Sequence, residues 1–300
     1  MSSPPFQSIA IVGLGLIGGS IALGVRERWP ASRVFGVDSE PVMAHALGSG
    51  AVDRAFASVD ALPEVSLVVL AAPVRQNIEL LQQIARREST ASGAPDGSRQ
   101  HLIVTDVGGT KREILKAARE LPPSMAFVGG HPLGGGERGG FAFARPDMFA
   151  NRAWIFTPEG QNADDAVERL SELAAGLGAR PSIMTAEHHD RLMAFVSHLP
   201  QLAASALMET VGAAVQGEGL QMAGRGLVDT TRLASSPADV WRDICLTNAD
   251  AIGDALECLI QRLTQLRGDL TRGEAVEAIF SEASKWRAEL LTPKPHVETS

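Results

Sequence analysis

A histidine in a glycine-rich segment is the residue of this sequence best placed for proton chemistry. His131 lies in the segment Gly129-Gly130-His131-Pro132-Leu133-Gly134-Gly135-Gly136-Glu137. A histidine among glycines is sterically open and titrates near neutral pH, so it can take a proton from a hydroxyl as hydride leaves the same carbon. Taken alone, such a histidine is as readily a turn or capping residue, so its role depends on the elements around it.

A second glycine segment has the pattern of a dinucleotide-binding turn. It follows a short apolar run and opens an apolar helical pattern. Gly13 would permit the tight turn, Gly15 the approach of a pyrophosphate, and Gly18 the close packing of helix on strand. The residues expected to bind the cofactor in this turn are Gly13, Gly15, Leu16, Ile17 and Gly18.

An acidic residue indicates which dinucleotide is bound. Asp38 lies 20 residues beyond Gly18, at the end of the next apolar run, and is followed by Ser39 and Glu40. A carboxylate at this position can accept hydrogen bonds from both ribose hydroxyls, whereas it would repel the 2′-phosphate of NADP. The sequence therefore predicts NAD as the cofactor.

The first half of the sequence alternates short apolar runs with helical segments. The runs are nearly continuous, which is typical of strands buried on both faces of a parallel sheet. We therefore predict an α/β fold with an N-terminal Rossmann-type, doubly wound parallel sheet and a C-terminal all-helical domain. The expected strands are residues 9–12, 34–38, 67–72, 102–106, 126–129 and 153–157, and a further short run near 181–184 ends the strand pattern. His131 would follow the fifth of them, at the carboxyl end of the sheet, where this architecture opens onto its ligand crevice.

Helical periodicity replaces the strand pattern from about residue 185. Leu192, Phe195 and Leu199 recur at three- and four-residue steps, and Pro200 should kink this helix. Helices this apolar in a small domain are expected to bury their excess faces against a second subunit, which predicts a homodimer. The predicted domains are a dinucleotide-binding domain over residues 1–184, a helical substrate and dimerisation domain over 185–292, and a polar tail over 293–300.

Composition narrows the classes of partner. The 300 residues carry a formal net charge of −8, which argues against a surface built for nucleic acid or anionic membranes. Cys245 and Cys258 are the two cysteines, so a disulfide framework is not expected. No signal peptide is recognisable, and no apolar run reaches the roughly 20 residues of a membrane span. We expect a cytoplasmic protein that acts on a small molecule.

Further sequence blocks resemble those of the prephenate and arogenate dehydrogenases. The resemblance runs from the nucleotide motif to about residue 250, and the order and spacing of the blocks make it specific. In addition to the two glycine segments, the blocks are Ala72-Pro73-Val74, Asp106-Val107-Gly108-Gly109-Thr110-Lys111, His189-Asp190, Ser197-His198-Leu199-Pro200 and Asp229-Thr230-Thr231-Arg232-Leu233-Ala234. The resemblance implies that Ala72 and Pro73 also contribute to the cofactor site.

The reaction implied by this resemblance is an NAD-dependent oxidative decarboxylation of prephenate, a dicarboxylate, or of arogenate. Hydride would pass from ring carbon C4 to the nicotinamide while the ring carboxylate leaves as carbon dioxide. His131 would be the base on the 4-hydroxyl, and Arg232 would clamp a substrate carboxylate. Glu137 would gate or polarise the pocket, and His189 would lie near the substrate. Judged without the resemblance, Glu137, His189 and Arg232 could each be a surface residue.

Two positions depart from the pattern of the family. Many relatives have serine where this chain has Gly109, and that hydroxyl is expected to contact both the catalytic histidine and the substrate hydroxyl. Thr110 or a water would have to replace it. Gln201 stands where prephenate-using relatives often have histidine. A neutral amide there makes the site less positive, which could shift the preference toward arogenate or permit both substrates.

Two other functions fit part of the pattern. A β-hydroxy-acid dehydrogenase shares the two-domain plan but uses a lysine of the helical domain as proton carrier, and residues 187–216 contain no lysine. A non-catalytic NAD-binding sensor of the same fold could have lost activity at the two departing positions. The joint retention of His131, Glu137 and Arg232 argues against that loss.

Overall fold

The computed structural model describes residues 3–91, 101–136, 138–160 and 163–292. The chain divides into two compact units, Met1–Ala251 and Ile252–Ser300. The first unit contains every candidate site residue that the structure describes.

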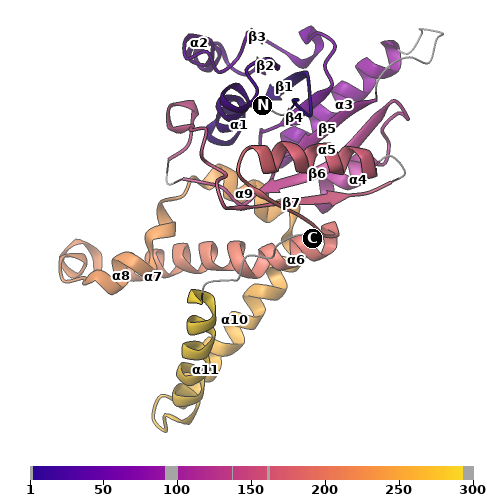
Figure 1. Cartoon of the computed structure of the whole chain (residues 1–300). Helices are drawn as coiled ribbons and strands as arrows, with labels where there is room; N and C mark the ends of the chain where they lie inside the picture. The colour runs from indigo at the N-terminus through magenta and orange to yellow at the C-terminus, as the bar shows by residue number, and fades with distance from the viewer. Residues whose placement is uncertain (1–2, 92–100, 137, 161–162, 293–300) are drawn as a thin grey trace. The chain divides into compact units, whose positions relative to one another are not determined.

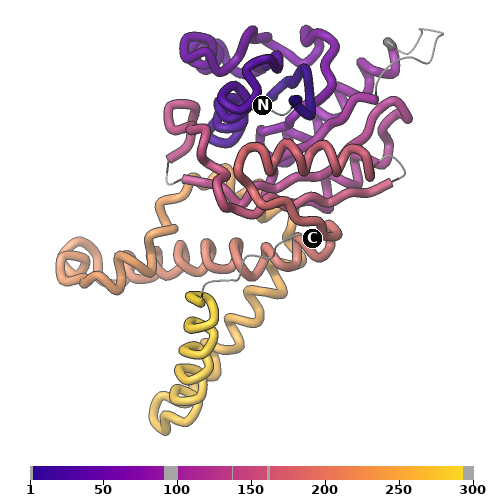
Figure 2. The backbone as a smooth tube through the Cα atoms, in the orientation of Figure 1, coloured from indigo at the N-terminus to yellow at the C-terminus, as the bar shows by residue number. Residues whose placement is uncertain are grey.

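One sheet forms the centre of the first unit (Figure 1). Within the described residues it has eight strands in the order β3-β2-β1-β4-β5-β6-β7-β8, and each neighbouring pair is parallel except β6 with β7. The strands are β1 (Ser8–Val12), β2 (Arg33–Val37), β3 (Arg54–Phe56), β4 (Leu67–Leu70), β5 (Leu102–Asp106), β6 (Met125–Pro132), β7 (Ala153–Pro158) and β8 (Arg180–Ile183). Strands β1 and β4 lie side by side although a long stretch of sequence separates them (Figure 2). The predicted doubly wound α/β fold is confirmed.

Helices cover both faces of this sheet, so alternate residues of each strand enter different cores. Ile9 and Ile11 of β1 pack with helices α1 and α5, whereas Ala10 and Val12 pack with α3 and α4. Burial on both faces explains why the strands are continuously apolar in sequence. The helices of this half are α1 (Leu16–Arg28), α2 (Glu40–Gly48), α3 (Val74–Ala91), α4 (Arg112–Ala118) and α5 (Ala163–Gly176), with short 3₁₀ turns at η1 (Val59–Ala61) and η2 (Phe141–Phe143).

The structure corrects the predicted strands at two places. Strand β3 was not predicted, because this three-residue edge strand begins with the exposed Arg54 and lacks a continuous apolar run. Strand β6 was predicted to end at Gly129, but it continues through His131 to Pro132. The reason is its antiparallel partner β7, which pairs Ile155 with His131. His131 therefore lies on a strand, not in a loop.

The described chain after residue 185 is helical, as predicted. Pro200 lies in the first turn of α7, directly after a π-helical turn, and the two together interrupt the predicted long helix. The elements are α6 (Ala186–Met193), the π turn η3 (Ala194–His198), α7 (Leu199–Gln221), α8 (Arg225–Thr230), the 3₁₀ turn η4 (Arg232–Ser235), α9 (Ala238–Thr247), α10 (Ala249–Asp269) and α11 (Glu274–Leu291). None of these or the earlier helices, within the described part of the chain, is long and apolar enough to span a membrane.

The first compact unit extends well beyond residue 184, where the sequence analysis placed a domain boundary. Asp190 of α6 accepts a hydrogen bond from the backbone of Lys111, and Asn248 donates to the backbone of Asp190. These bonds tie the first helical segments to the sheet domain. The boundary at 184 and 185 remains a prediction, and the predicted tail, 293–300, lies outside the described residues.

The second unit contains most of α10 and all of α11. Asp269, at the end of α10, accepts hydrogen bonds from Arg272 and from the backbone of Ala275, and so closes the turn into α11. Gly273 in this turn has φ of +87°, a value that L side chains rarely adopt. Large apolar side chains remain exposed on these helices, among them Ile260, Leu263, Phe280, Trp286 and Leu290.

Candidate active site

The glycines before His131 permit close packing of β6. A Cβ atom on Gly129 would lie 2.4 Å from Oγ1 of Thr157, and one on Gly130 would lie 2.6 Å from the carbonyl oxygen of Asp106. Side chains at both positions would therefore clash with neighbouring strands. These glycines bring the backbone beneath His131 against β5 and β7 and do not form an open loop.

Two histidines and a carboxylate form a hydrogen-bonded chain at this edge of the sheet. Nδ1 of His131 lies 2.8 Å from Nε2 of His189, and Nδ1 of His189 lies 2.8 Å from Oδ1 of Asp190. His189 and Asp190 are fully buried, whereas His131 is half-buried. His131 is therefore the member of the chain that a bound molecule can reach, and His189 is not a surface residue.

The hydrogen bonds between His131, His189 and Asp190 determine which nitrogen of each ring carries the proton. Because the Asp190 carboxylate accepts a hydrogen bond, His189 carries its proton on Nδ1 and presents a lone pair on Nε2. His131 then donates from Nδ1 to that lone pair and keeps its own lone pair on Nε2. A Cβ atom placed on Gly109 would lie 4.0 Å from this Nε2. The nitrogen of His131 that can act as a base therefore faces Gly109.

The surroundings of His131 and His189 keep both imidazole rings neutral. Burial lowers the pKa of His131 well below its ordinary value, and the positive charge of Lys111 acts in the same direction. Burial also lowers the pKa of His189, although its hydrogen bond to Asp190 opposes the shift. Burial alone would raise the pKa of Asp190, but hydrogen bonds from His189 and the Arg112 backbone lower it. At neutral pH His131 is thus a neutral imidazole, the form that a general base requires.

Asp190 also joins helix α6 to the start of helix α4. Its carboxylate accepts hydrogen bonds from the backbone amides of Lys111 and Arg112, at 2.7 and 2.9 Å. The guanidinium of Arg112 continues this network to Asp190, Asn248 and Asp250. Asp190 was not predicted as a site residue, although it directly follows His189 in the sequence. Its location directly after a candidate histidine was the available signal.

A buried ion pair beneath β6 was also missed. Nζ of Lys111 contacts both carboxylate oxygens of Asp106, and both side chains are fully buried. The two residues belong to a sequence block that the analysis quoted without assigning them functions. A lysine and an aspartate at the carboxyl end of an apolar strand could have indicated a buried pair, since a lone buried charge is costly.

Gly109 and Thr110 lie in the loop that faces His131. The nearest atom to a Cβ on Gly109 would be Cδ1 of Ile244 at 3.7 Å, so there is room for a small side chain. The Thr110 hydroxyl is fully buried and lies 2.8 Å from the Thr247 hydroxyl. Because Thr247 donates to a backbone carbonyl, Thr110 must donate to Thr247. The Thr110 hydroxyl proton is therefore used in the bond to Thr247. Thr110 does not donate a hydrogen bond to His131 in place of the serine that the family resemblance leads one to expect at position 109.

Gln201 is buried and bonded to the turn that carries Arg232. Its side-chain amide donates to the Leu233 carbonyl at 2.7 Å, and its oxygen accepts from the Ser236 hydroxyl at 3.1 Å. The side chain of Gln201 thus connects α7 to both ends of η4, while Arg232 itself is exposed. Glu137, the other predicted polar site residue, lies outside the described residues.

The dinucleotide turn has the backbone geometry that the sequence predicted. Gly13 has φ of +94°, and a Cβ atom there would lie 2.7 Å from the backbone of Ala71. A Cβ on Gly18 would lie 1.9 Å from the Gly13 carbonyl oxygen, whereas one on Gly15 would meet nothing within 4 Å. Gly15 therefore leaves open space at the N-terminus of α1, which begins with Leu16 and Ile17. Such an opening at a helix N-terminus suits a phosphate group.

A cavity of about 700 Å³ adjoins this turn and contains Asp38. The Asp38 carboxylate accepts hydrogen bonds from the backbone amides of Leu14 and Ser39, both at 2.6 Å. It is thereby held at the end of β2, where a ribose would lie in this fold. The predicted cofactor residues that line the cavity are Gly13, Gly15, Asp38, Ala72 and Pro73.

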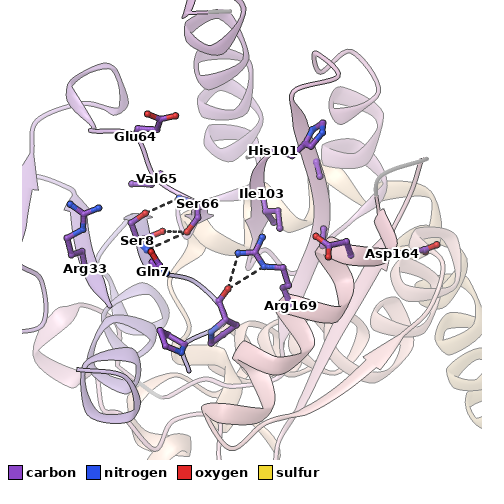
Figure 3. Close-up of a pocket in the computed structure, with 15 residues that line it drawn as sticks. Gln7, Ser8, Arg33, Glu64, Val65, Ser66, His101, Ile103, Asp164 and Arg169 are labelled. Carbon is purple, nitrogen blue, oxygen red and sulfur yellow. Dashed lines mark hydrogen bonds between the residues drawn. The ribbon is translucent and has the colours of Figure 1, made fainter. Parts of the chain in front are cut away.

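Another cavity, of about 870 Å³, lies at the opposite edge of the sheet (Figure 3). It contains none of the predicted site residues. Two of its polar side chains bond to the protein itself: Ser66 donates to the Ser8 carbonyl, and Arg169 donates to the carbonyl of Pro5. This cavity therefore lies apart from His131 and from the predicted cofactor residues.

Comparison with known proteins identifies the family. The family model described as prephenate dehydrogenase, nucleotide-binding domain, matches residues 21–183, and the one described as prephenate dehydrogenase, dimerization domain, matches residues 185–281. The prephenate dehydrogenase of Bacillus subtilis (strain 168) is 35% identical over 269 residues, covering 87% of this chain and 69% of its own length. The cyclohexadienyl dehydrogenase of Zymomonas mobilis is 31% identical over 294 residues, covering 96% of this chain and 97% of its own.

A solved structure agrees with the sequence comparisons. The prephenate dehydrogenase of Aquifex aeolicus, crystallised in complex with hydroxyphenyl propionate and NAD+, superposes with a TM-score of 0.84 at 27% identity. The match covers 95% of this chain and 98% of the Aquifex chain. The family models together extend over both the sheet domain and the helices that follow it. This chain therefore belongs to the prephenate dehydrogenase family.

Proposed function

We propose that this protein is an enzyme that oxidatively decarboxylates prephenate to 4-hydroxyphenylpyruvate, arogenate to tyrosine, or both, with NAD as oxidant. The observation that carries the proposal is the neutral His131, whose basic Nε2 is oriented by His189 and Asp190. A cyclohexadienol needs one base at its hydroxyl, because loss of carbon dioxide and gain of aromaticity make the rest of the reaction downhill.

The cofactor site fits NAD. When bound, NAD would supply the hydride acceptor, and the Aquifex relative was crystallised with NAD+. Gly15 leaves space for the pyrophosphate at the start of α1, and Asp38 offers its carboxylate to the ribose hydroxyls. A 2′-phosphate would meet the negative charge of Asp38, so NAD is favoured over NADP.

The proton moves through a single catalytic residue, His131. Its Nε2 takes the proton of the substrate 4-hydroxyl as the C4–H bond breaks and the carbonyl forms. The resulting imidazolium is stabilised because His131 donates to His189, which donates in turn to the ionised Asp190. His189 is therefore a positioning residue behind the base, and we do not assign it a contact with the substrate.

The substrate carboxylate is assigned to Arg232. A guanidinium stays charged and binds a carboxylate through two parallel hydrogen bonds. Arg232 lies on η4, which Gln201 holds through Leu233 and Ser236. We infer that Gln201 affects substrate choice by positioning this turn and by leaving the region without a second cation. Glu137 is retained as a candidate gating residue.

We further propose that the protein is a homodimer. The second family model is described as a dimerization domain and covers residues 185–281. Phe280 is 68% exposed and Leu263 is 55% exposed, which is costly for single helices in water. A second copy of the chain would remove these side chains from solvent.

Steady-state assays test the reaction. Purified protein is given prephenate or arogenate with NAD or NADP, and NADH or NADPH formation is followed by absorbance. Turnover with NAD and either substrate is expected, and the ratio of kcat/KM values identifies the preferred substrate. NAD binding without any turnover would instead support the non-catalytic sensor.

Replacing the base tests its role. His131→Asn should lower kcat by about 100-fold or more, because general base catalysis contributes at least that much, with little change in NAD affinity. His101→Asn is the matched control, since His101 is exposed at the opposite edge of the sheet. Equal turnover of the two variants would exclude His131 as the base.

A further inference from the structure

Lys111 is a buried lysine whose ammonium group is fully engaged. Nζ lies 2.6 Å from Oδ1 of Asp106, contacts Oδ2 of the same carboxylate, and lies 2.7 Å from the Gly130 carbonyl oxygen. Three oxygen acceptors match the three N–H bonds of a charged ammonium. Lys111 therefore has no proton left to donate to a substrate, and any effect on the reaction must act through its neighbours.

The ion pair holds the backbone on two sides of the catalytic base. Asp106 accepts hydrogen bonds from the amides of Gly108 at 2.8 Å and Gly130 at 3.1 Å, while Lys111 binds the Gly130 carbonyl. Gly130 directly precedes His131. Gly108 directly precedes the residue that faces Nε2 of His131. One ion pair thus fixes both the strand that carries the base and the loop opposite it.

The backbone of both segments packs closely against this pair. A Cβ atom on Gly129 would lie 3.1 Å from Cδ of Lys111, and one on Gly108 would lie 2.8 Å from Oδ2 of Asp106. The glycines of both segments are therefore needed so that the backbone can approach the ion pair. This gives a physical reason for Gly108 and Gly129 that the nucleotide site does not provide.

We propose that the buried Lys111–Asp106 pair is the positioning element for His131, setting both the location of the base and the electrostatic potential in which it works. The proposal rests on the proposed role of His131. A cation beneath the ring opposes protonation of His131 and so keeps the base neutral at lower pH. The other titratable groups that face this ring are His189 and Asp190 of α6 and, more remotely, His198.

Two variants separate positioning from simple stabilisation. Asp106→Asn keeps the shape of the side chain but leaves the Lys111 charge uncompensated. Adding Lys111→Met to it removes both charges and the hydrogen bond to Gly130. Lys116→Met is the matched control, because Lys116 is an exposed lysine on the same helix α4. Each variant is checked for folding by thermal unfolding and for NAD affinity by titration.

The two variants should differ in the pH at which the acid limb of kcat/KM lies. In Asp106→Asn, the acid limb of kcat/KM should shift to lower pH. Burial lowers the pKa of Lys111, but in the acidic range where His131 titrates the lysine is still charged, and without the Asp106 carboxylate it opposes protonation of His131 more strongly. In the double variant the acid limb should lie at higher pH than in Asp106→Asn. Relative to the parent, kcat of the double variant should fall about tenfold or more, while its NAD affinity stays within about threefold. Lys116→Met should match the parent in all these values.

Other outcomes would overturn the proposal. A purely structural pair would lower thermal stability and NAD affinity without a downward shift of the acid limb in Asp106→Asn and without its reversal when Lys111→Met is added. If the double variant does not fold, an unchanged acid limb in Asp106→Asn alone is enough to reject the electrostatic role. Titration of the His131 ring proton by NMR gives the same comparison without turnover. Failure of the proposed reaction is therefore distinguishable from failure of this inference.

Discussion

Nε2 of His189 lies 2.8 Å from Nδ1 of His131, the ring nitrogen of the base that does not face Gly109. His189 is buried and its other nitrogen is bonded to Asp190. The protein thus uses one histidine to set the tautomer of another. The arrangement resembles a catalytic triad in its logic, with a second imidazole between the base and the carboxylate.

The neighbouring histidines His188 and His189 allow a matched test of this relationship. His189→Asn should lower kcat about tenfold to 100-fold, because His131 loses the group that orients its ring and directs the lone pair to Nε2. His188→Asn should have little effect, because His188 is exposed. The comparison is made on kcat at saturating NAD and substrate. Similar losses in both variants would show that helix α6, and not the His189 ring, is what matters.

Stability should depend on pH through His198. Burial lowers the pKa of His198 to about 4, whereas an unfolded histidine titrates near 6.5. Between these values the unfolded chain binds more protons than the folded chain. The contribution of His198 to stability is therefore complete above about pH 6.5 and is lost as the pH falls. The loss amounts to about 3 kcal/mol at pH 4. Urea unfolding at several pH values measures the slope.

A variant assigns that slope to one residue. His198→Gln should reduce the dependence on pH between about 6.5 and 4, whereas His101→Gln, at an exposed position, should leave it as in the parent. A parent protein whose free energy of unfolding is constant over this range would contradict the assignment of a neutral, buried His198.

The space beside Gly109 predicts a gain of activity. A serine hydroxyl, one bond beyond a Cβ that would lie 4.0 Å from Nε2 of His131, can reach both that nitrogen and a substrate hydroxyl. Gly109→Ser should therefore raise kcat/KM by up to about tenfold, the value of one well-placed hydrogen bond. Gly109→Ala is the control that fills the same space without a hydroxyl. An equal change in both variants would mean that volume alone is responsible.

Gln201 should affect substrate binding through the turn that it holds. Gln201→Met removes the hydrogen bonds to Leu233 and Ser236, so KM for the carboxylate substrate should rise by about tenfold while NAD affinity is unchanged. Gln221→Met, at an exposed position near the end of the same helix, is the control. An unaltered KM would show that η4 holds Arg232 without help from Gln201.

The amino-acid sequence by itself determined the class of fold and the cofactor turn. Gly13 and Gly18 indicate the local geometry because only a residue without Cβ fits there. A Cβ atom on Gly13 would lie 2.7 Å from the Ala71 backbone, and one on Gly18 would lie 1.9 Å from the Gly13 carbonyl oxygen. Continuous apolar runs such as β1 predict strands buried on both faces, since each alternate residue must enter one of two cores. These are local constraints, which a linear pattern can express.

Only the tertiary structure decided how the polar residues are connected. His131 and His189 are 58 positions apart, and a buried histidine bonded to a carboxylate has the same sequence signature as one on a helix surface. Likewise, the Thr110 hydroxyl donates its proton to Thr247, which lies on helix α9, far away in the sequence. Hydrogen bonds act over about 3 Å in space, so partners distant in sequence become identifiable only when the chain folds and the strands set their register.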